Sequence, residues 1–590
     1  MKDFRGLLLS AIIGLTTAAP TPSHSARSRN VTIDHATGLP IVDLGYQLHR
    51  ALVFNETGDY YNFTNIRYAA SPTGDLRFRE PQSPRVNRTH IDDGHIERVC
   101  PQSYPLWEDT STEFVIKYLS GGYANETSAA RSKRQAPPLH SRETEDCLFL
   151  DIAVPKPVFE NAGNDDGVPV LVWIFGGGYI GGDKSGSTSG SPAGMLKRAD
   201  NGIIYVAINY RLGAFGWLGG ETYENSDGVP NLGFYDQRFA LQWVQDHIAE
   251  FGGDPDRVTV MGESSGASGI LHQITAFGGD ADTLFSQAIV QSPGFLPMVQ
   301  PQKLEDNLQT FLNLSGVSSI EEARKLPSEK LVAANFQMVT YSSYGSFTFG
   351  PTIDHNFVQT LPALALKNGD FDDDIRLLIG HNSDEGLIFA SASTVNASVF
   401  PINVVASAPT LSQEDLDFID NKLYPAVFDG SAGWPDDVMR SATFAADIGF
   451  LCNAYALGKY TKDAYMYEFG VYPALHGTDI QYTFYNGPST PGSNAGATPT
   501  NSTLAKRGVK EMTTYNKAAV SLQEWITSFA MTGKPSTSHP EVAFPLYGGD
   551  QKILKLVDDQ SAPVTAKDDI VADRCNAWID RLFPALIKDL

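Results

Sequence analysis

The sequence predicts an α/β fold in which helices flank one large, mostly parallel central sheet. Two observations carry this prediction. Short apolar runs recur along the chain without the alternation of a half-exposed strand, which is typical of strands buried on both faces. Segments with helical periodicity lie between these runs, and strands that alternate with helices are the pattern of α/β layers.

The expected strands include six short apolar runs. They are PVLVWIF (169–175), IIYVAINY (203–210), RVTVMG (257–262), QAIVQS (287–292), IRLLIG (375–380) and DAYMYEF (463–469). The clearest helix is FYDQRFALQWVQDHIAEFGG, where Leu241, Val244, Ile248 and Phe251 repeat at three- and four-residue steps. A double glycine ends that pattern.

The N-terminus predicts a secretory signal over residues 1–19. Lys2 and Arg5 precede an apolar core over residues 7–15, and small residues follow as far as Ala19. We expect the remaining 30–590 to form one large domain, since no interior linker or repeat divides it. No later run is long enough to span a membrane.

Composition and charge narrow the possible partners. The chain has 590 residues with 42% apolar and 19% charged side chains, which fits a globular protein and not a disordered one. Its formal net charge of −24 would repel phosphate backbones, so nucleic acid is excluded as a partner. Nothing indicates a cofactor, and no C-x-x-C motif or Cys/His cluster indicates a metal site.

Secretion would bring oxidation and glycosylation. The four cysteines, Cys100, Cys147, Cys452 and Cys575, suggest two disulfides with three possible pairings. N-x-S/T sequons, which become glycans only where they are exposed, occur eight times: Asn30, Asn55, Asn62, Asn87, Asn125, Asn313, Asn396 and Asn501.

The stretch RVTVMGESSGASG places Ser264 between glycines directly after a predicted strand. A G-x-S-x-G match alone is weak evidence in a chain with 53 glycines. Its position at a strand end, with a helix expected from about Ala267, favours a nucleophile on a tight turn over a flexible Gly/Ser loop. Glycines at 262 and 266 permit the backbone angles and the close packing that such a turn needs.

An activated serine needs a base, an acid and donors for an oxyanion. When the acid and then the histidine follow the serine along the chain, the histidines that can act as base are His476 and His539. His539 lies in a proline-bracketed loop, so His476 is the better candidate. The acid is Asp384 or Glu385, which both follow the predicted strand at 375–380, and spacing does not separate them.

A glycine run upstream offers the oxyanion donors. The strand at 169–175 ends in Gly176-Gly177-Gly178, and glycines let backbone amides approach a substrate oxygen. Such a run at one strand end, upstream of Ser264 at another, is a much stronger signal than either motif alone.

These motifs resemble the type B carboxylesterase/lipase family. The resemblance runs from about residue 40 almost to the C-terminus and includes EDCLFLDI, FGGGY, NYRLGAFGWL and GGDPDRVTVMGESSGA. It implies a single α/β-hydrolase domain with a sheet of eleven to fourteen strands. It also implies Ser264 as nucleophile, Glu385 as acid and His476 as base.

The resemblance implies further assignments. Oxyanion donors would be the backbone N–H groups of Gly177, Gly178 and Ser265, where many relatives carry alanine at 265. The disulfides would be Cys100–Cys147 and Cys452–Cys575. The expected activity is hydrolysis of a small-molecule or lipid ester through an acyl-enzyme; a non-catalytic adhesion protein on the same fold is the remote alternative.

The loop between Cys100 and Cys147 bears on the substrate. A capping box at Thr110 and Glu113 predicts a short apolar helix there. The helix belongs either to a mobile lid, as in similar triacylglycerol lipases or sterol esterases, or to a fixed wall. Trp107 does not match the choline-binding position of cholinesterases. Lys133-Arg134 is a dibasic processing site or, more simply, a solvated turn.

Overall fold

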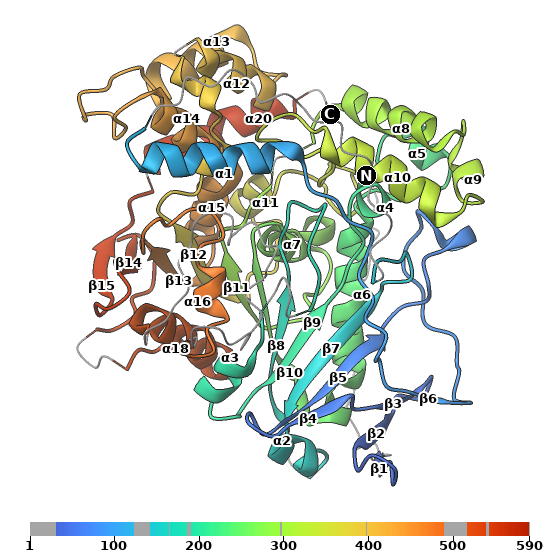
Figure 1. Ribbon diagram of the computed structural model, residues 1–590. Helices are drawn as coiled ribbons and strands as arrows, with labels where there is room; N and C mark the ends of the chain where they lie inside the picture. Colours follow the sequence, from blue (N-terminus) through green and yellow to red (C-terminus); the bar gives the residue numbers. More distant parts are fainter. Residues whose placement is uncertain are drawn as a thin grey trace, which may run out of the picture.

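An eleven-stranded mixed sheet forms the centre of the computed structural model (Figure 1), which describes residues 31–122, 142–164, 166–185, 190–295, 298–396, 398–488, 516–538, 542–570, 572–588 and 590. In spatial order its strands are β15 (Val564–Lys567), β14 (Lys552–Leu556), β13 (Asp463–Phe469), β12 (Arg376–Asn382), β11 (Gln287–Gln291), β10 (Gly253–Glu263), β8 (Val168–Ile174), β9 (Ile204–Ile208), β7 (Phe149–Pro155), β5 (Tyr60–Arg67) and β4 (Val53–Asn55). The seven strands from β14 to β9 run parallel, and the strands at both edges pair antiparallel.

The register of the parallel strands aligns their carboxyl ends. Gly262 near the end of β10 pairs with Ile174 at the end of β8 and with Val290 on β11. Gln291 in turn pairs with Gly380 on β12. Because side chains that follow such strands emerge at one sheet edge, segments far apart in the sequence meet there.

All six predicted strands are confirmed, with β10 starting at Gly253 instead of Arg257. They are buried on both faces, as their unbroken apolar runs predicted. The predicted helix at 234–253 is α6 (Leu232–His247), which continues as a 3₁₀ turn to Phe251 and ends at Gly252 with φ of 92°. Gly252 therefore supplies the left-handed residue that ends the segment.

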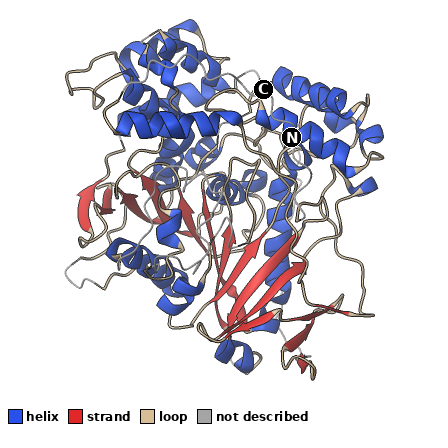
Figure 2. Ribbon diagram, viewed as in Figure 1, coloured by secondary structure: helices blue, strands red, loops and turns tan. Residues whose placement is uncertain are grey.

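Helices flank the sheet (Figure 2). α7 (Ser265–Ile274) packs against β10 and β11, and α18 (Lys517–Thr532) packs against β8 and β10. The shorter helices beside the sheet are α2 (Lys156–Asn161), α3 (Ala193–Arg198), α4 (Ala214–Trp217), α11 (Pro362–Asn368), α15 (Cys452–Tyr460) and α16 (Ile480–Thr483), whereas α5 (Glu221–Asn225) packs against α8 (Pro301–Ser315) (Figure 1). None of the helices in the described part of the chain combines the length and apolarity that a bilayer crossing needs.

A layer of helices lies at the top of the view in Figure 1, beyond the carboxyl ends of the parallel strands. It contains α1 (Leu106–Leu119), α8 (Pro301–Ser315), α9 (Ile320–Ala323), α10 (Ser328–Thr340), α12 (Val399–Ser407), α13 (Gln413–Phe418), α14 (Asp437–Ala446) and α20 (Phe583–Leu586). α19 (Ala572–Ala577) lies near α15. A separate four-stranded sheet of β1 (Val31–Ile33), β2 (Pro40–Asp43), β3 (Leu48–Arg50) and β6 (Ile91–Asp92) was not predicted.

Candidate active site

Ser264 stands alone between β10 and α7, on a sharp turn. Its φ of 56° and ψ of −125° are unfavourable for a residue with a side chain, and strain of this kind costs roughly 1–3 kcal/mol. The Ser264 N–H donates to the Gln291 carbonyl at 3.0 Å, which ties the turn to β11. A Cβ at Gly262 would lie 2.7 Å from the Gly266 carbonyl carbon, and one at Gly266 only 2.1 Å from the Ile174 carbonyl oxygen. Both flanking glycines are therefore required by close packing.

His476 reaches this turn from the loop after β13. Its Nε2 lies 2.8 Å from the Ser264 Oγ, and its Nδ1 lies 2.6 Å from the Glu385 Oε2. Phe450 packs against the imidazole with ring centroids 4.3 Å apart, and Phe389 does so at 5.9 Å. The imidazole thus packs against two aromatic rings, both its nitrogens are in hydrogen-bonding contact, and the Glu263 Oε1 lies 3.6 Å from Nε2.

Glu385 is fully buried, and its second carboxylate oxygen, Oε1, accepts several hydrogen bonds. Oε1 accepts from the Asn382 backbone N–H at 2.6 Å, the Ser292 hydroxyl at 2.5 Å and the Asn382 side-chain amide at 3.3 Å. Burial raises the pKa of this carboxyl. His476 and these hydrogen bonds outweigh burial, so the pKa lies below its ordinary value of 4.5 and the group is anionic at neutral pH.

Asp384, the alternative acid, is placed differently. Its backbone N–H donates to the Ala474 carbonyl at 2.9 Å, next to the loop that carries His476. Burial, Glu468 and Glu385 raise the pKa of Asp384 to about 6. Of these two candidates, Glu385 is the one whose carboxylate contacts His476 Nδ1, so the structure separates two residues that spacing could not.

The glycine run after β8 lies against the serine turn. A Cβ at Gly176 would fall 2.9 Å from the Ser264 Cβ, which shows how closely the two segments approach. Gly177 and Gly178 have φ of 123° and 62°, in the region that favours glycine. Within the described residues, neither amide N–H donates to another protein group. The Ser265 amide is the first of α7, where an N–H has no partner within its own helix.

Further aromatic side chains pack against Phe389, which contacts the His476 ring. Trp107 on α1 packs against Phe389 at 5.9 Å and Phe347 at 5.7 Å between ring centroids. The Phe347 ring in turn lies against Gly178, where a Cβ would approach it to 2.6 Å. One aromatic cluster therefore touches both the imidazole and the glycine run.

α1, the helix of the disulfide-closed loop, is attached at several points in its described part. Trp107 Nε1 donates to the Ser346 carbonyl at 2.9 Å, Ser111 donates to the Ile388 carbonyl, and the Tyr118 hydroxyl donates to Asp436 at 3.0 Å. Phe114 and Val115 are buried against residues 387–390 and 438–442. The helix starts at Leu106 after Pro105, so the prediction that Thr110 caps it is wrong.

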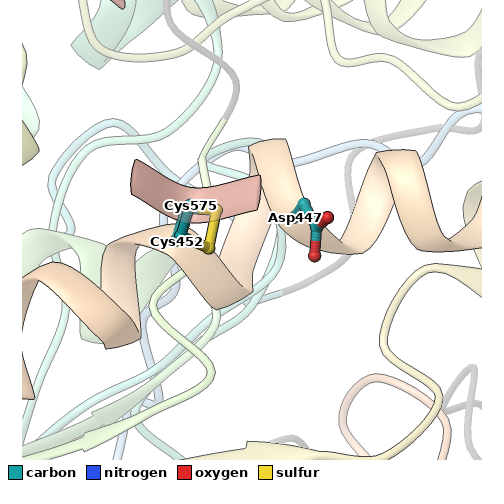
Figure 3. Close-up of side chains that lie close together, drawn as sticks. All are labelled: Asp447, Cys452 and Cys575. Atoms are coloured by element: carbon teal, nitrogen blue, oxygen red, sulfur yellow. A yellow bond between two sulfur atoms is a disulfide. The ribbon is translucent and has the colours of Figure 1, made fainter. Parts of the chain in front are cut away.

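Both disulfides implied by the resemblance are present, Cys100–Cys147 and Cys452–Cys575. Asp447 lies close to the second of them (Figure 3), a grouping with the residue types of a metal site. The two sulfurs are bonded to each other, and thiolate ligands would need them free. The Asp447 carboxylate accepts from the Arg574 guanidinium at 2.5 Å and the Tyr424 hydroxyl at 2.8 Å. This cluster is therefore structural.

A family model described as the carboxylesterase family matches residues 50–578, most of the chain. The chain belongs to this family. It is 38% identical to the carboxylesterase patB of Penicillium expansum over 92% of this chain and 96% of that protein. It is also 30% identical to a secreted lipase of Arthroderma benhamiae over 74% and 82% of the two chains.

Among solved structures, EstA of Aspergillus niger is similar, with a TM-score of 0.73 and 23% identity over 93% of this chain and 99% of that one. The α/β-hydrolase fold is thereby confirmed. This carboxylesterase-family member is a carboxylic ester hydrolase, and its substrates are small-molecule esters. Both of these sequence relatives are named as ester-cleaving enzymes, a carboxylesterase and a lipase.

Two residues of the carboxylesterase's site were missed by the sequence analysis, Ser292 and Asn382. Both follow or end predicted strands, β11 and β12, at the sheet edge where Ser264 and Glu385 emerge. That position was the available signal. The motif-based search overlooked them because it asked for a nucleophile, a base, an acid and amide donors, not for groups that bond the acid.

Several predictions fall outside the described residues: the signal over residues 1–19, His539, Lys133-Arg134, and the sequons at Asn30, Asn125 and Asn501. Of the other sequons, Asn87, Asn313 and Asn396 are exposed, whereas Asn55 and Asn62 are half-buried. Asn55 is also engaged, because its side chain donates to the Tyr60 hydroxyl at 2.9 Å and accepts from the Gly58 N–H at 2.9 Å.

Proposed function

We propose that this carboxylesterase is a secreted serine esterase with Ser264 as nucleophile, His476 as general base and Glu385 as the acid that orients it. The observation that carries the proposal is the pair of hydrogen bonds that links the three side chains, 2.8 Å from Ser264 to His476 and 2.6 Å from His476 to Glu385. Hydrogen bonds of this length are within the reach that proton transfer requires.

Acylation follows from this arrangement. The Ser264 Oγ bonds to the ester carbonyl carbon while His476 Nε2 takes the hydroxyl proton and the carbonyl π electrons move to oxygen. Glu385, anionic at neutral pH, keeps the Nδ1–H directed toward itself and stabilises the imidazolium that forms. Collapse of the tetrahedral intermediate breaks the bond to the alkoxy group, which leaves as the alcohol with the proton from Nε2.

The amides of Gly177, Gly178 and Ser265 would donate to the oxyanion during both tetrahedral stages. Within the described residues the N–H groups of Gly177 and Gly178 donate to no protein acceptor, so they need not break a bond first. In the second stage water attacks the acyl carbon, gives its proton to His476, and the Ser264 oxygen leaves as the hydroxyl. The products are the carboxylic acid and the free enzyme.

The attachment of α1 favours a carboxylesterase for soluble esters over an interfacially activated lipase. Opening a lid at α1 would remove Trp107 from Phe347 and Phe389, expose Phe114 and Val115, and break the bonds of Ser111 and Tyr118. Moving large buried aromatic side chains into water costs several kcal/mol in total. α1 therefore acts as a fixed wall of the site.

Secretion, the domain boundary near residue 30 and N-glycosylation belong to the same proposal. The order of charged, apolar and small residues over 1–19 supports a cleaved signal. We expect glycans on the exposed Asn87, Asn313 and Asn396, and none on the half-buried Asn55 and Asn62. N-terminal sequencing and glycopeptide mapping of the secreted protein test both points; glycans at Asn55 and Asn62 alone would contradict the second.

The decisive experiment is Ser264→Ala measured with p-nitrophenyl butyrate. We expect a burst of p-nitrophenol equal to the enzyme concentration in the wild type, and loss of both burst and turnover in the variant. Ser286→Ala is the matched control, because Ser286 lies at the opposite end of the strands and its hydroxyl bonds only backbone carbonyls. Retained turnover in Ser264→Ala would refute the mechanism.

A further inference from the structure

Tyr179 follows directly after the two glycines of the proposed oxyanion loop and has an unfavourable backbone conformation. Its φ is 63°, so Gly177, Gly178 and Tyr179 form three consecutive residues with positive φ. A tyrosine has no intrinsic preference for this region, unlike the glycines before it. Neighbouring groups must therefore hold Tyr179 in place.

All three polar groups of Tyr179 are hydrogen-bonded. Its backbone N–H donates to the Ser265 Oγ at 3.3 Å, and its hydroxyl donates to the Ser268 Oγ at 2.6 Å. Its carbonyl accepts from the Gly213 N–H at 2.8 Å. Two of the three partners are thus side chains of α7, the helix that begins directly after Ser264.

The two serines form a polar stripe on the buried face of α7. Ser265 and Ser268 are one turn apart, both are fully buried, and His272 continues the stripe one turn further. His272 Nδ1 lies 3.3 Å from the Ser268 Oγ and 2.7 Å from the Ser268 carbonyl oxygen. Both buried hydroxyls have hydrogen-bond partners: Tyr179 contacts each of them, and the Tyr210 hydroxyl also interacts with Ser265.

An alanine at position 265 would leave the amide of that residue in position but provide no acceptor for the Tyr179 N–H. The Tyr179 N–H, which belongs to the Gly178–Tyr179 peptide group, would then lose its hydrogen bond to α7. This difference concerns the position of the amides, not their number.

We propose that the side chains of Ser265 and Ser268 are positioning residues that fix the oxyanion loop to the nucleophile helix, through the backbone N–H and the hydroxyl of Tyr179. Oxyanion donors act only if they are held in place before the charge develops, and a small displacement weakens them. The inference rests on the proposed function, in which Gly177 and Gly178 donate to the oxyanion.

The test compares Ser265→Ala, Ser268→Ala and the double variant with the wild type. Removing an oxyanion donor outright lowers kcat by roughly 100-fold or more, so misplacing donors should cost less. We expect kcat to fall about tenfold in Ser265→Ala and further in the double variant. KM should stay near the wild-type value, because the ester is bound before the oxyanion forms.

Two further measurements separate positioning from general destabilisation. An alkyl trifluoromethyl ketone adds to the serine and forms an oxyanion, whereas the matching methyl ketone binds without doing so. Affinity for the first should fall by the same factor as kcat, and affinity for the second should not change. Thr275→Val is the control: it removes a hydroxyl from the far end of α7, where Thr275 bonds the Leu271 carbonyl, and should lower Tm but not kcat.

Rates are expressed per active site, counted from the p-nitrophenol burst, so that an unfolded fraction does not enter them. The proposal is overturned if Ser265→Ala and the double variant both keep kcat and trifluoromethyl ketone affinity within about twofold of the wild type. Failure of the proposed function would look different, since Ser264→Ala would then stay active whatever the α7 variants do.

Discussion

Replacing Glu385 by glutamine should slow catalysis by forcing the wrong tautomer on His476. Glutamine offers one oxygen and one NH₂ group in place of two carboxylate oxygens. The Oε1 position faces the backbone N–H and the side-chain amide of Asn382, at 2.6 and 3.3 Å, and both are fixed donors. The glutamine oxygen will therefore face Asn382, and its NH₂ group will face His476.

An NH₂ group at this place donates a hydrogen bond to His476 Nδ1. Nδ1 must then present its lone pair, so the imidazole proton lies on Nε2. The imidazole then presents N–H to Ser264 and accepts no proton from it. Turning the amide around would leave the Asn382 backbone N–H without its acceptor, at about 2 kcal/mol, whereas the Asn382 side-chain amide would keep Ser292 and Asp479 as acceptors. A penalty of about 2 kcal/mol corresponds to a loss of roughly 30-fold in kcat, at roughly 1.4 kcal/mol for each factor of ten.

The assay is kcat for p-nitrophenyl butyrate, with Tm and the circular dichroism spectrum as measures of folding. Asp384→Asn is the control, since this neighbouring residue is half-buried and its hydrogen bond is to the Ala474 carbonyl, not to the imidazole; it should keep most of the activity. The reasoning is refuted if Glu385→Gln keeps more than about a tenth of the wild-type kcat. Loss of activity in Asp384→Asn alone would make Asp384 the acid.

Three other predictions concern the wall, the buried ion pair and the second disulfide. The rate with emulsified tributyrin should show no jump at the solubility limit, and Trp107→Ala should lower activity on soluble esters; a jump would indicate a mobile lid. Burial lowers the pKa of His381, but Asp568, 3.4 Å away, together with Glu468 and Glu385, raises it to about 9. The charged His381 therefore stabilises the fold by on the order of 3 kcal/mol. This stabilisation is complete below pH 6.5 and is lost as pH rises through about 9. Between these pH values the Tm of the wild type should fall more steeply than the Tm of His381→Gln, and equal slopes would contradict the prediction. Replacing both Cys452 and Cys575 by serine opens a loop of 123 residues and should lower the free energy of unfolding by about 5 kcal/mol. Opening the 47-residue loop of Cys100 and Cys147 should lower it by about 4 kcal/mol. Denaturant titration measures both values, and a smaller loss for the longer loop would contradict the chain-entropy model.

The buried sheet was predictable because each of its strands has a local sequence signal. Runs such as 169–175 and 463–469 are apolar over their whole length, so their burial on both faces can be read without knowing their neighbours. The four-stranded sheet near the N-terminus was not predictable. β3 and β6 contain three and two residues, and the parallel pairing that joins Leu48 to Ile91 spans a long stretch of chain.

The site was predictable to the level of motifs, not of contacts. Ser264 is marked by its glycines and by the strand before it. Glu385 and Asp384 share the same strand end, and only the turn after β12 decides which side chain faces His476. Asn382 and Ser292 carry no motif, since their role depends on where Glu385 points. α1 shows the same limit, because the burial of Trp107 extends the helix to Leu106, ahead of the capping box.

The order in which the ribosome makes this chain has a consequence for when it becomes active. β13 is among the last strands of the sheet to be synthesised, and His476 follows it, about four fifths of the way along the chain. A nascent chain that ends before this loop holds Ser264 but lacks the base that the proposed mechanism assigns to it. Under that mechanism, ester cleavage begins only after about four fifths of the chain has been synthesised.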